Sequence, residues 1–136
     1  MKFDKKFWIA FVVIFILTSL LGFAVHGAWL APDYAKLTGV MRTDEEQMGL
    51  MHFMVIAHLF YAFGLCWVYR MGHDSSKAWL GQGIRFGIAI TVLIWIPVYL
   101  IYHTVAYFPM AVAVKQIIGE LVSSIIVGLT LAFLHK

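Results

Sequence analysis

The 136-residue sequence is poor in charged residues and in cysteine. Asp, Glu, Lys and Arg make up only 12% of it, against about a quarter in soluble domains. The ten basic residues are scattered among apolar segments and form no continuous basic face, so we do not expect nucleic acid as a partner. The single cysteine, Cys66, has no partner for an internal disulfide and stands in an apolar run, where we expect a buried packing residue.

Signatures of familiar chemistry are also missing. The sequence has no CxxC pair, no phosphate-binding loop and no HExxH motif, and no nucleophile stands at a recognisable spacing from a base. It has no internal repeat and no low-complexity tract. We therefore predict one domain over residues 1-136 without a catalytic residue, and we do not expect an enzyme.

Long apolar segments dominate what is present. Hydrophobic residues make up 62% of the chain, and four stretches are long enough to cross a hydrocarbon core of about 30 Å at about 1.5 Å per helical residue. They predict helices at approximately 7-30, 44-70, 75-107 and 110-134, with an outer polar loop at 31-43. Thr43 and Glu46 form a capping-box pattern before the second helix. The predicted fold is an all-α integral membrane four-helix bundle.

Basic residues are unequally distributed between the two ends of this predicted bundle. Seven fall on the side of the termini: Lys2, Lys5, Lys6, Arg70, Lys77, Arg85 and Lys136. Three fall on the other side: Lys36, Arg42 and Lys115. Because segments rich in Lys and Arg stay in the cytoplasm, we expect both termini to be cytoplasmic.

A few polar residues interrupt the apolar spans, and such residues usually face the interior of a bundle. Helical rise predicts that one titratable residue of each helix lies about 6–8 Å below the outer surface: His26, His52, His103 and Lys115. It places His58 and Glu120 deeper, at about 15–17 Å. We predict an interior polar network that fixes the register of the helices: His58, Tyr61, Tyr99, Gln116 and Glu120. Gly83 and Gly87 are expected to let a neighbouring helix approach closely.

Three alternative functions use the same residues. Two histidines from different helices can bind haem b, and the candidates are His58, His103 and His52. Imidazoles and thioethers suit copper or another metal, for which the candidates are His26, His52, His103 and Met51, with Met48 and Met110. A buried carboxylate beside a histidine is typical of a proton relay, so Glu120 with His58 and Lys115 would suit a small proton-coupled transporter.

The pattern His26-Gly-Ala-Trp29 through Tyr34, the capped outer loop and Gly83-Ile-Arg85-Phe-Gly87 resemble small bacterial four-helix integral membrane proteins of unknown function. The resemblance implies a multi-pass protein of the bacterial inner (plasma) membrane and carries over no catalytic residue. Taken together, these patterns favour a structural or accessory component of a membrane protein assembly. Its expected partners are the lipid bilayer and other membrane protein subunits or a second copy, and no cofactor is expected.

Overall fold

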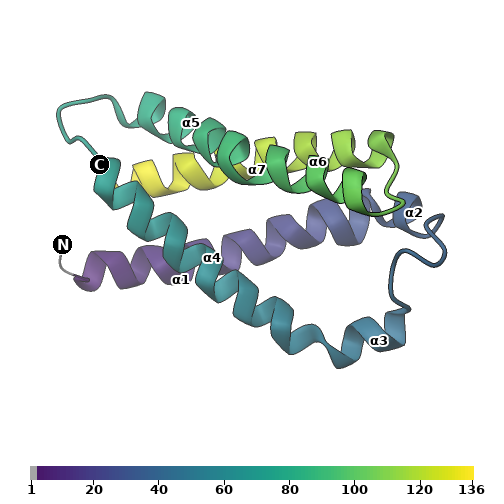
Figure 1. Ribbon diagram of the computed structural model, residues 1–136. Helices are drawn as coiled ribbons and strands as arrows, with labels where there is room; N and C mark the ends of the chain where they lie inside the picture. The colour runs from purple at the N-terminus through teal and green to yellow at the C-terminus, as the bar shows by residue number, and fades with distance from the viewer. Residues whose placement is uncertain (1–2) are drawn as a thin grey trace.

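Residues 3–136 of the chain are described by a computed structural model, and they form helices and no strand (Figure 1). Met1 and Lys2 lie outside the described residues, so Lys2, one of the seven basic residues counted on the side of the termini, is not placed. Four helical segments are long and apolar enough to cross a membrane: Lys5–Trp29, Met51–Gly72, Trp79–Val105 and Met110–His135. The prediction of an all-helical chain with four candidate spans is confirmed.

The first span is continuous but changes its helical geometry. Helix α1 (Lys5–Gly22) starts after Asp4, whose carboxylate accepts a hydrogen bond from the backbone N–H of Phe7 at 2.9 Å. It passes into a π-helical segment, η1 (Phe23–Trp29), and then into the short helix α2 (Ala31–Tyr34). Pro32 stands in the first turn of α2, where a missing N–H breaks no helical hydrogen bond. The expected outer loop at 31-43 therefore starts later, after Tyr34.

The second predicted helix is divided in two, α3 (Asp44–Gly49) and α4 (Met51–Gly72). The predicted capping box is present at its start. The Thr43 hydroxyl accepts a hydrogen bond from the backbone N–H of Glu46 at 3.3 Å, and the Glu46 carboxylate accepts one from the backbone N–H of Thr43 at 2.9 Å. Leu50, with φ −105° and ψ 5°, departs from helical geometry and separates α3 from α4.

The third span begins at Trp79 rather than at residue 75 and comprises α5 (Trp79–Ile90), η2 (Thr91–Trp95) and α6 (Ile96–Val105). The loop before it is held by the Gln82 side chain. Its Oε1 accepts a hydrogen bond from the backbone N–H of Asp74 at 2.9 Å, and its amide donates to the carbonyl oxygens of Asp74 and Lys77. The last helix, α7 (Met110–His135), follows Pro109.

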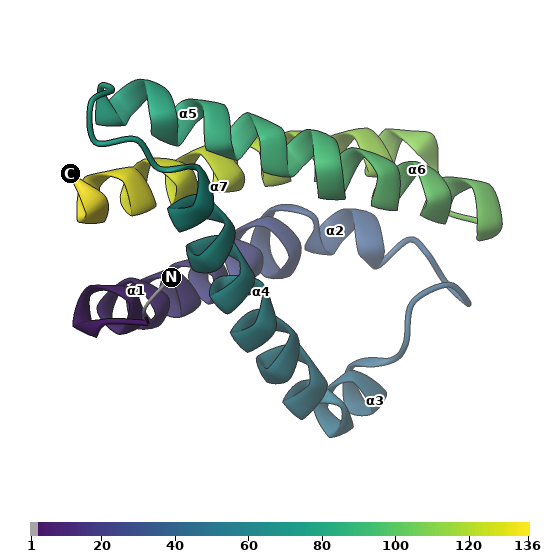
Figure 2. The same cartoon turned by 60° about the vertical axis from the view of Figure 1, so that its left-hand side comes forward.

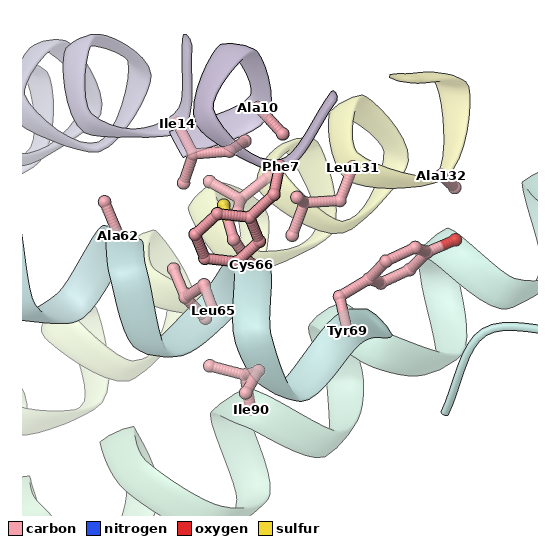
Figure 3. Close-up of a cluster of buried hydrophobic side chains, with 11 residues drawn as sticks. Phe7, Ala10, Ile14, Ala62, Leu65, Cys66, Tyr69, Ile90, Leu131 and Ala132 are labelled. Atoms are coloured by element: carbon pink, nitrogen blue, oxygen red, sulfur yellow. The ribbon is translucent and has the colours of Figure 1, made fainter. Parts of the chain in front are cut away.

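The helices are arranged around α7, which packs against α5, η2, α6 and α1 and is the most buried span. Figures 1 and 2 show α5 and α6 lying along α7, and α4 crossing α1. Both chain ends lie at the same end of the molecule (Figure 1). An apolar core fills that end and includes Phe7 and Ile14 of α1, Cys66 of α4 and Leu131 of α7 (Figure 3).

Helices α5 and α7 approach each other closely through glycines. A Cβ atom added to Gly83 would lie 2.8 Å from the carbonyl oxygen of Gly128, and one added to Gly87 would lie 2.5 Å from the Cα of Ile125. Both distances are shorter than van der Waals contact, so only glycine fits at these positions. Gly83 and Gly87, expected at a helix contact, thus both lie against the backbone of α7.

The outer half of α4, which we define as Met51–Phe60, diverges from the remaining helices in both views (Figures 1 and 2). Every residue in this segment is exposed apart from the half-buried His58. The inner half, in contrast, contributes Ala62, Leu65 and Cys66 to the apolar core. Helix α4 is therefore anchored to the bundle at one end only.

Candidate functional site

A cluster of polar side chains lies inside the bundle where η1, α2, α6 and α7 meet. Its centre is the pair His26 of η1 and Glu120 of α7, whose Nε2 and Oε1 atoms are 2.8 Å apart. The other ring nitrogen of His26, Nδ1, lies 2.5 Å from the hydroxyl of Tyr34. Gln116 donates from its side-chain amide to the same hydroxyl at 2.9 Å, and the Tyr99 hydroxyl donates to Glu120 at 3.4 Å. We call these five residues the polar cluster.

The direction of the hydrogen bonds follows from the chemistry of their members. The Gln116 amide nitrogen can only donate, so the Tyr34 oxygen accepts from it and its own proton is available for His26 Nδ1. Neutral His26 then carries its proton on Nε2 and donates to Glu120. The His26 ring thus links the Tyr34 hydroxyl to the Glu120 carboxylate.

The members of the polar cluster differ in burial. Glu120 is only 8% exposed, and Gln116 and Tyr99 are similarly buried. The side chain of His26 is 32% exposed and lies at the edge of the cluster. A buried carboxylate needs partners because its transfer from water is costly, and the His26 and Tyr99 contacts supply them. The cluster therefore fixes η1 and α6 against α7.

Two further contacts extend along α7 on either side of the cluster. Toward the middle of the helix, the indole N–H of Trp95 donates to the Ser124 hydroxyl at 3.1 Å, and the Tyr61 ring packs edge-on against Trp95 at 5.6 Å. Toward the outer end, the Lys115 ammonium lies 2.8 Å and 3.0 Å from the two carboxylate oxygens of Asp33 in α2. Lys115, which the proton-relay alternative placed beside Glu120, is thus paired with a different acid.

The predicted interior network needs a correction in its membership. The structure brings Tyr99, Gln116 and Glu120 together, but the histidine bonded to Glu120 is His26 rather than His58. His58 packs against the backbone of Gly22, where an added Cβ atom would lie 3.3 Å from the imidazole ring. Within residues 3–136, the buried Nδ1 of His58 has no hydrogen-bond partner.

A regular α-helix that ends near Leu30 places His26 well above Glu120. In the structure His26 lies in the π-helical segment η1, which ends at Trp29 and is followed by a bend at Leu30 and by α2. The rise of a regular α-helix therefore does not apply to His26, which meets Glu120 at 2.8 Å. Asp33 and Tyr34 were missed because α2 was assigned to the loop, and no apolar periodicity marks so short a helix.

The histidines considered for haem or copper are not brought together. His26 is bonded within the polar cluster, and His52 lies with Met51 on the exposed half of α4, its ring 4.3 Å from that of Phe53. The Nδ1 atom of His103 lies 2.6 Å from the carbonyl oxygen of Phe108. In the part of the chain that the structure describes, no three His, Cys, Asp or Glu side chains form a group suited to a metal ion.

Comparisons of the chain with protein families, with curated proteins and with solved structures find no match. The geometry of the polar cluster supports helix fixation, because the His26 ring and the Glu120 carboxylate are in direct contact across two helices. A second feature is the outer half of α4, which is exposed apart from His58.

Proposed function

We propose that this chain is a multi-pass membrane protein that serves as an accessory component of a membrane protein assembly. The observation that carries the proposal is the outer half of α4, a mainly apolar helical segment in which only His58 is partly covered by the rest of the described chain. The partner in the proposal is a transmembrane helix of a different subunit, and it packs on this segment.

The distribution of polar side chains supports a membrane environment. The buried face of α7 carries Gln116, Glu120, Ser123 and Ser124, while large apolar side chains cover the outside of all four spans. This is the reverse of a water-soluble bundle, in which the apolar face of each helix turns inward. In lipid, ionisable and hydroxyl side chains turn toward the bundle interior because acyl chains offer them no hydrogen bonds.

Orientation and location are part of the same proposal. Both chain ends and the loop at 73–78 lie at one end of the molecule, and the basic residues there are more numerous than at the other end (Figure 1). Positively charged segments are retained in the cytoplasm, so the termini are cytoplasmic in this arrangement. The membrane is then the bacterial inner membrane, and α3 lies on its outer side.

The charge of α3 favours a different subunit over a second copy as the partner. Asp44, Glu45 and Glu46 form the first turn of α3, directly before the exposed half of α4. Two copies in one membrane have the same orientation, so packing through α4 would bring their acidic turns together. Like charges at close range oppose such a dimer. A transmembrane helix with basic residues at its outer end has the complementary charge.

The experiment is purification of the tagged chain from its native membrane in a mild detergent. We expect another membrane protein to copurify in fixed stoichiometry, and Phe60→Ala to reduce its yield. Leu93→Ala is the matched control, because Phe60 and Leu93 are 76% and 73% exposed but only Phe60 lies on α4. A monomer, or a dimer of this chain alone, would overturn the proposal.

The polar cluster supports a second candidate, a small proton-coupled transporter. The observation in its favour is the direct contact between the buried Glu120 carboxylate and the imidazole of His26, which is itself 32% exposed at the edge of the cluster. In vesicles, Glu120→Gln should then abolish a pH-dependent flux without unfolding the protein. A flux that persists, or loss of the fold alone, would assign the pair a structural role.

A further inference from the structure

A cavity of about 220 Å³ lies at the end of the molecule that holds both termini, between the loop at 73–78, the start of α5 and the end of α7. Its lining is mainly polar and basic: His73, Ser75, Lys77, Ala78, Trp79, Gln82, His135 and Lys136. The cavity is remote from the polar cluster, which lies toward the other end of α7. We call it the inner cavity.

The wall of the inner cavity is held in place by buried hydrogen bonds. Gln82 is 8% exposed, and its side chain bonds to both the N–H and the carbonyl oxygen of Asp74 and to the carbonyl oxygen of Lys77. The Asp74 carboxylate in turn accepts hydrogen bonds from the N–H and the hydroxyl of Ser76. The loop that carries the basic side chains is thus tied to α5 at several points and is not a free surface turn.

His135 brings an unused polar atom to this cavity. The residue is 9% exposed, and its Nδ1 lies 2.8 Å from the carbonyl oxygen of Leu131, to which it donates. Its Nε2 is buried and has no hydrogen-bond partner among residues 3–136. Buried polar atoms without a partner are rare in folded proteins because each costs about 1–3 kcal/mol. Because Nδ1 donates to Leu131, Nε2 of the neutral ring is an acceptor, and it becomes a donor to an anion when the ring is protonated.

A second unpartnered polar atom belongs to Tyr69, whose ring neighbours that of His135. The Tyr69 side chain is 3% exposed, its hydroxyl has no partner within the described residues, and its ring lies 5.4 Å from that of His135. Figure 3 shows this hydroxyl pointing away from Leu65 and Cys66, on the side of Ala132. The ring of His73 lies 5.8 Å from Tyr69 and 5.9 Å from His135 and completes a group of three.

The charges around the cavity are predominantly positive. Lys77 and Lys136 line it, while Arg70, outside the lining, is paired with Asp4 at 2.9 Å. The Lys136 ammonium lies 4.0 Å from the centre of the Phe133 ring, which orders the side chain without neutralising it. The Asp74 carboxylate is paired with Lys77 at 3.1 Å. One carboxylate against the two lysines of the lining leaves a positive charge, so the inner cavity suits an anion.

We propose that the inner cavity binds a phosphate group, with Lys77, Lys136 and Ser75 as donors and His135 Nε2 as a donor in its protonated form. Phosphate oxygens accept several charge-assisted hydrogen bonds at once, which matches this set of donors. A phosphate bound at Nε2 itself favours the protonated ring, because an opposite charge nearby stabilises the imidazolium. The phosphate comes from a free anion or from a phospholipid headgroup, and only the second source depends on the proposed membrane location.

The first experiment is calorimetric titration of the purified protein with inorganic phosphate in phosphate-free, non-ionic detergent. We expect saturable binding that becomes about tenfold weaker in His135→Gln, since a hydrogen bond to a charged group is lost. Lys136→Gln, at an exposed position that leaves the core intact, should also weaken binding. His52→Gln is the control, because His52 lies on the outer half of α4, far from the inner cavity. This variant should bind phosphate as tightly as the wild type. Undetectable binding of both phosphate and lipid, or equal binding by all variants, would overturn the proposal.

The second experiment separates the two sources. A short-chain phosphatidylglycerol is titrated into the same detergent solution, and native mass spectrometry records phospholipid retained by the extracted protein. If the headgroup is the ligand, the lipid displaces inorganic phosphate and remains bound during purification, and His135→Gln loses it. If the free anion is the ligand, phosphate binds and the lipid does not displace it. Retained lipid that is equal in the wild type and His135→Gln would contradict the headgroup source.

Discussion

The glycine contact between α5 and α7 leads to a quantitative prediction for Gly87→Ala. In the structure a Cβ atom at this position would lie 2.5 Å from the Cα of Ile125 and 2.6 Å from the carbonyl oxygen of Ser124. Ordinary van der Waals contact begins at 3.4 Å, so the overlap is close to 1 Å. The atoms it meets belong to the backbone of α7. The clash is therefore relieved only by moving the two helices apart.

The cost of this movement follows from core packing. Inserting a methyl group into a well-packed contact costs about 1–3 kcal/mol, and we expect the upper part of that range because no flexible side chain can move aside. Replacing a helical glycine with alanine also gains about 1 kcal/mol in helix propensity. Gly64→Ala in α4 isolates that gain, since no atom lies within 4 Å of its added Cβ. The difference between the two variants is thus expected to be about 2–3 kcal/mol, due to the clash alone.

The assay is reversible unfolding in mixed micelles with increasing sodium dodecyl sulfate, followed by far-ultraviolet circular dichroism. Gly87→Ala should unfold at a lower detergent fraction than the wild type, and Gly64→Ala at an equal or higher one. If Gly87→Ala is as stable as Gly64→Ala, then α5 and α7 do not approach each other through this glycine.

Three further perturbations test other parts of the structure. The ion pair with Arg70 and the hydrogen bond from the Phe7 N–H lower the pKa of Asp4 from 3.8 to about 2. The ionised carboxylate therefore stabilises the fold above pH 3.8, and this contribution is lost as the pH falls toward 2. Asp4→Asn should therefore show a smaller loss of thermal stability than the wild type across this window. Glu120→Leu leaves His26 without its hydrogen-bond acceptor and should lower the free energy of unfolding by about 1–3 kcal/mol. Glu120→Gln keeps an acceptor and should lower it less. Unfolding in the same micelles measures both variants. Thr43→Ala removes the N-cap of α3, at a cost of about 1 kcal/mol, and should speed amide hydrogen exchange in α3 while α4 is unchanged.

Features that depend on neighbouring residues could be predicted from the sequence. Apolar length alone indicates the four candidate spans, and Thr43 and Glu46 form their capping box with each other within one helical turn. Gly83 and Gly87 are four residues apart and so share one face of α5, which is why they were assigned to a contact. In each case the relevant geometry is set by helical rise and rotation within a single element.

Contacts between helices were less predictable, and the polar cluster shows why. Which histidine meets Glu120 depends on the rotation, tilt and true ends of two separate helices. The π-helical segment η1 changes the rotation of His26, and α2 follows it after a bend at Leu30. Neither feature is visible in the spacing of apolar residues. His58 was preferred because its depth matched, but its ring packs against Gly22, and the histidine bonded to Glu120 is His26.

The divergence of α4 has a different origin. Its outer half is mainly apolar, with His52 and His58 as its polar residues. A helix of this kind is equally suited to lipid, to its own bundle or to another chain. The sequence therefore predicts the helix but not its neighbour. In the structure only His58 of this half is partly covered, where its ring lies against Gly22.

The most direct test of the proposed role is a photoreactive amino acid placed at Phe60 and activated in the native membrane. The proposal predicts a crosslink to one other membrane protein. The same amino acid at Leu93, which is equally exposed but lies on η2, should crosslink only to lipid. If Phe60 also crosslinks only to lipid, the outer half of α4 has no protein partner and the assignment as an accessory component is wrong.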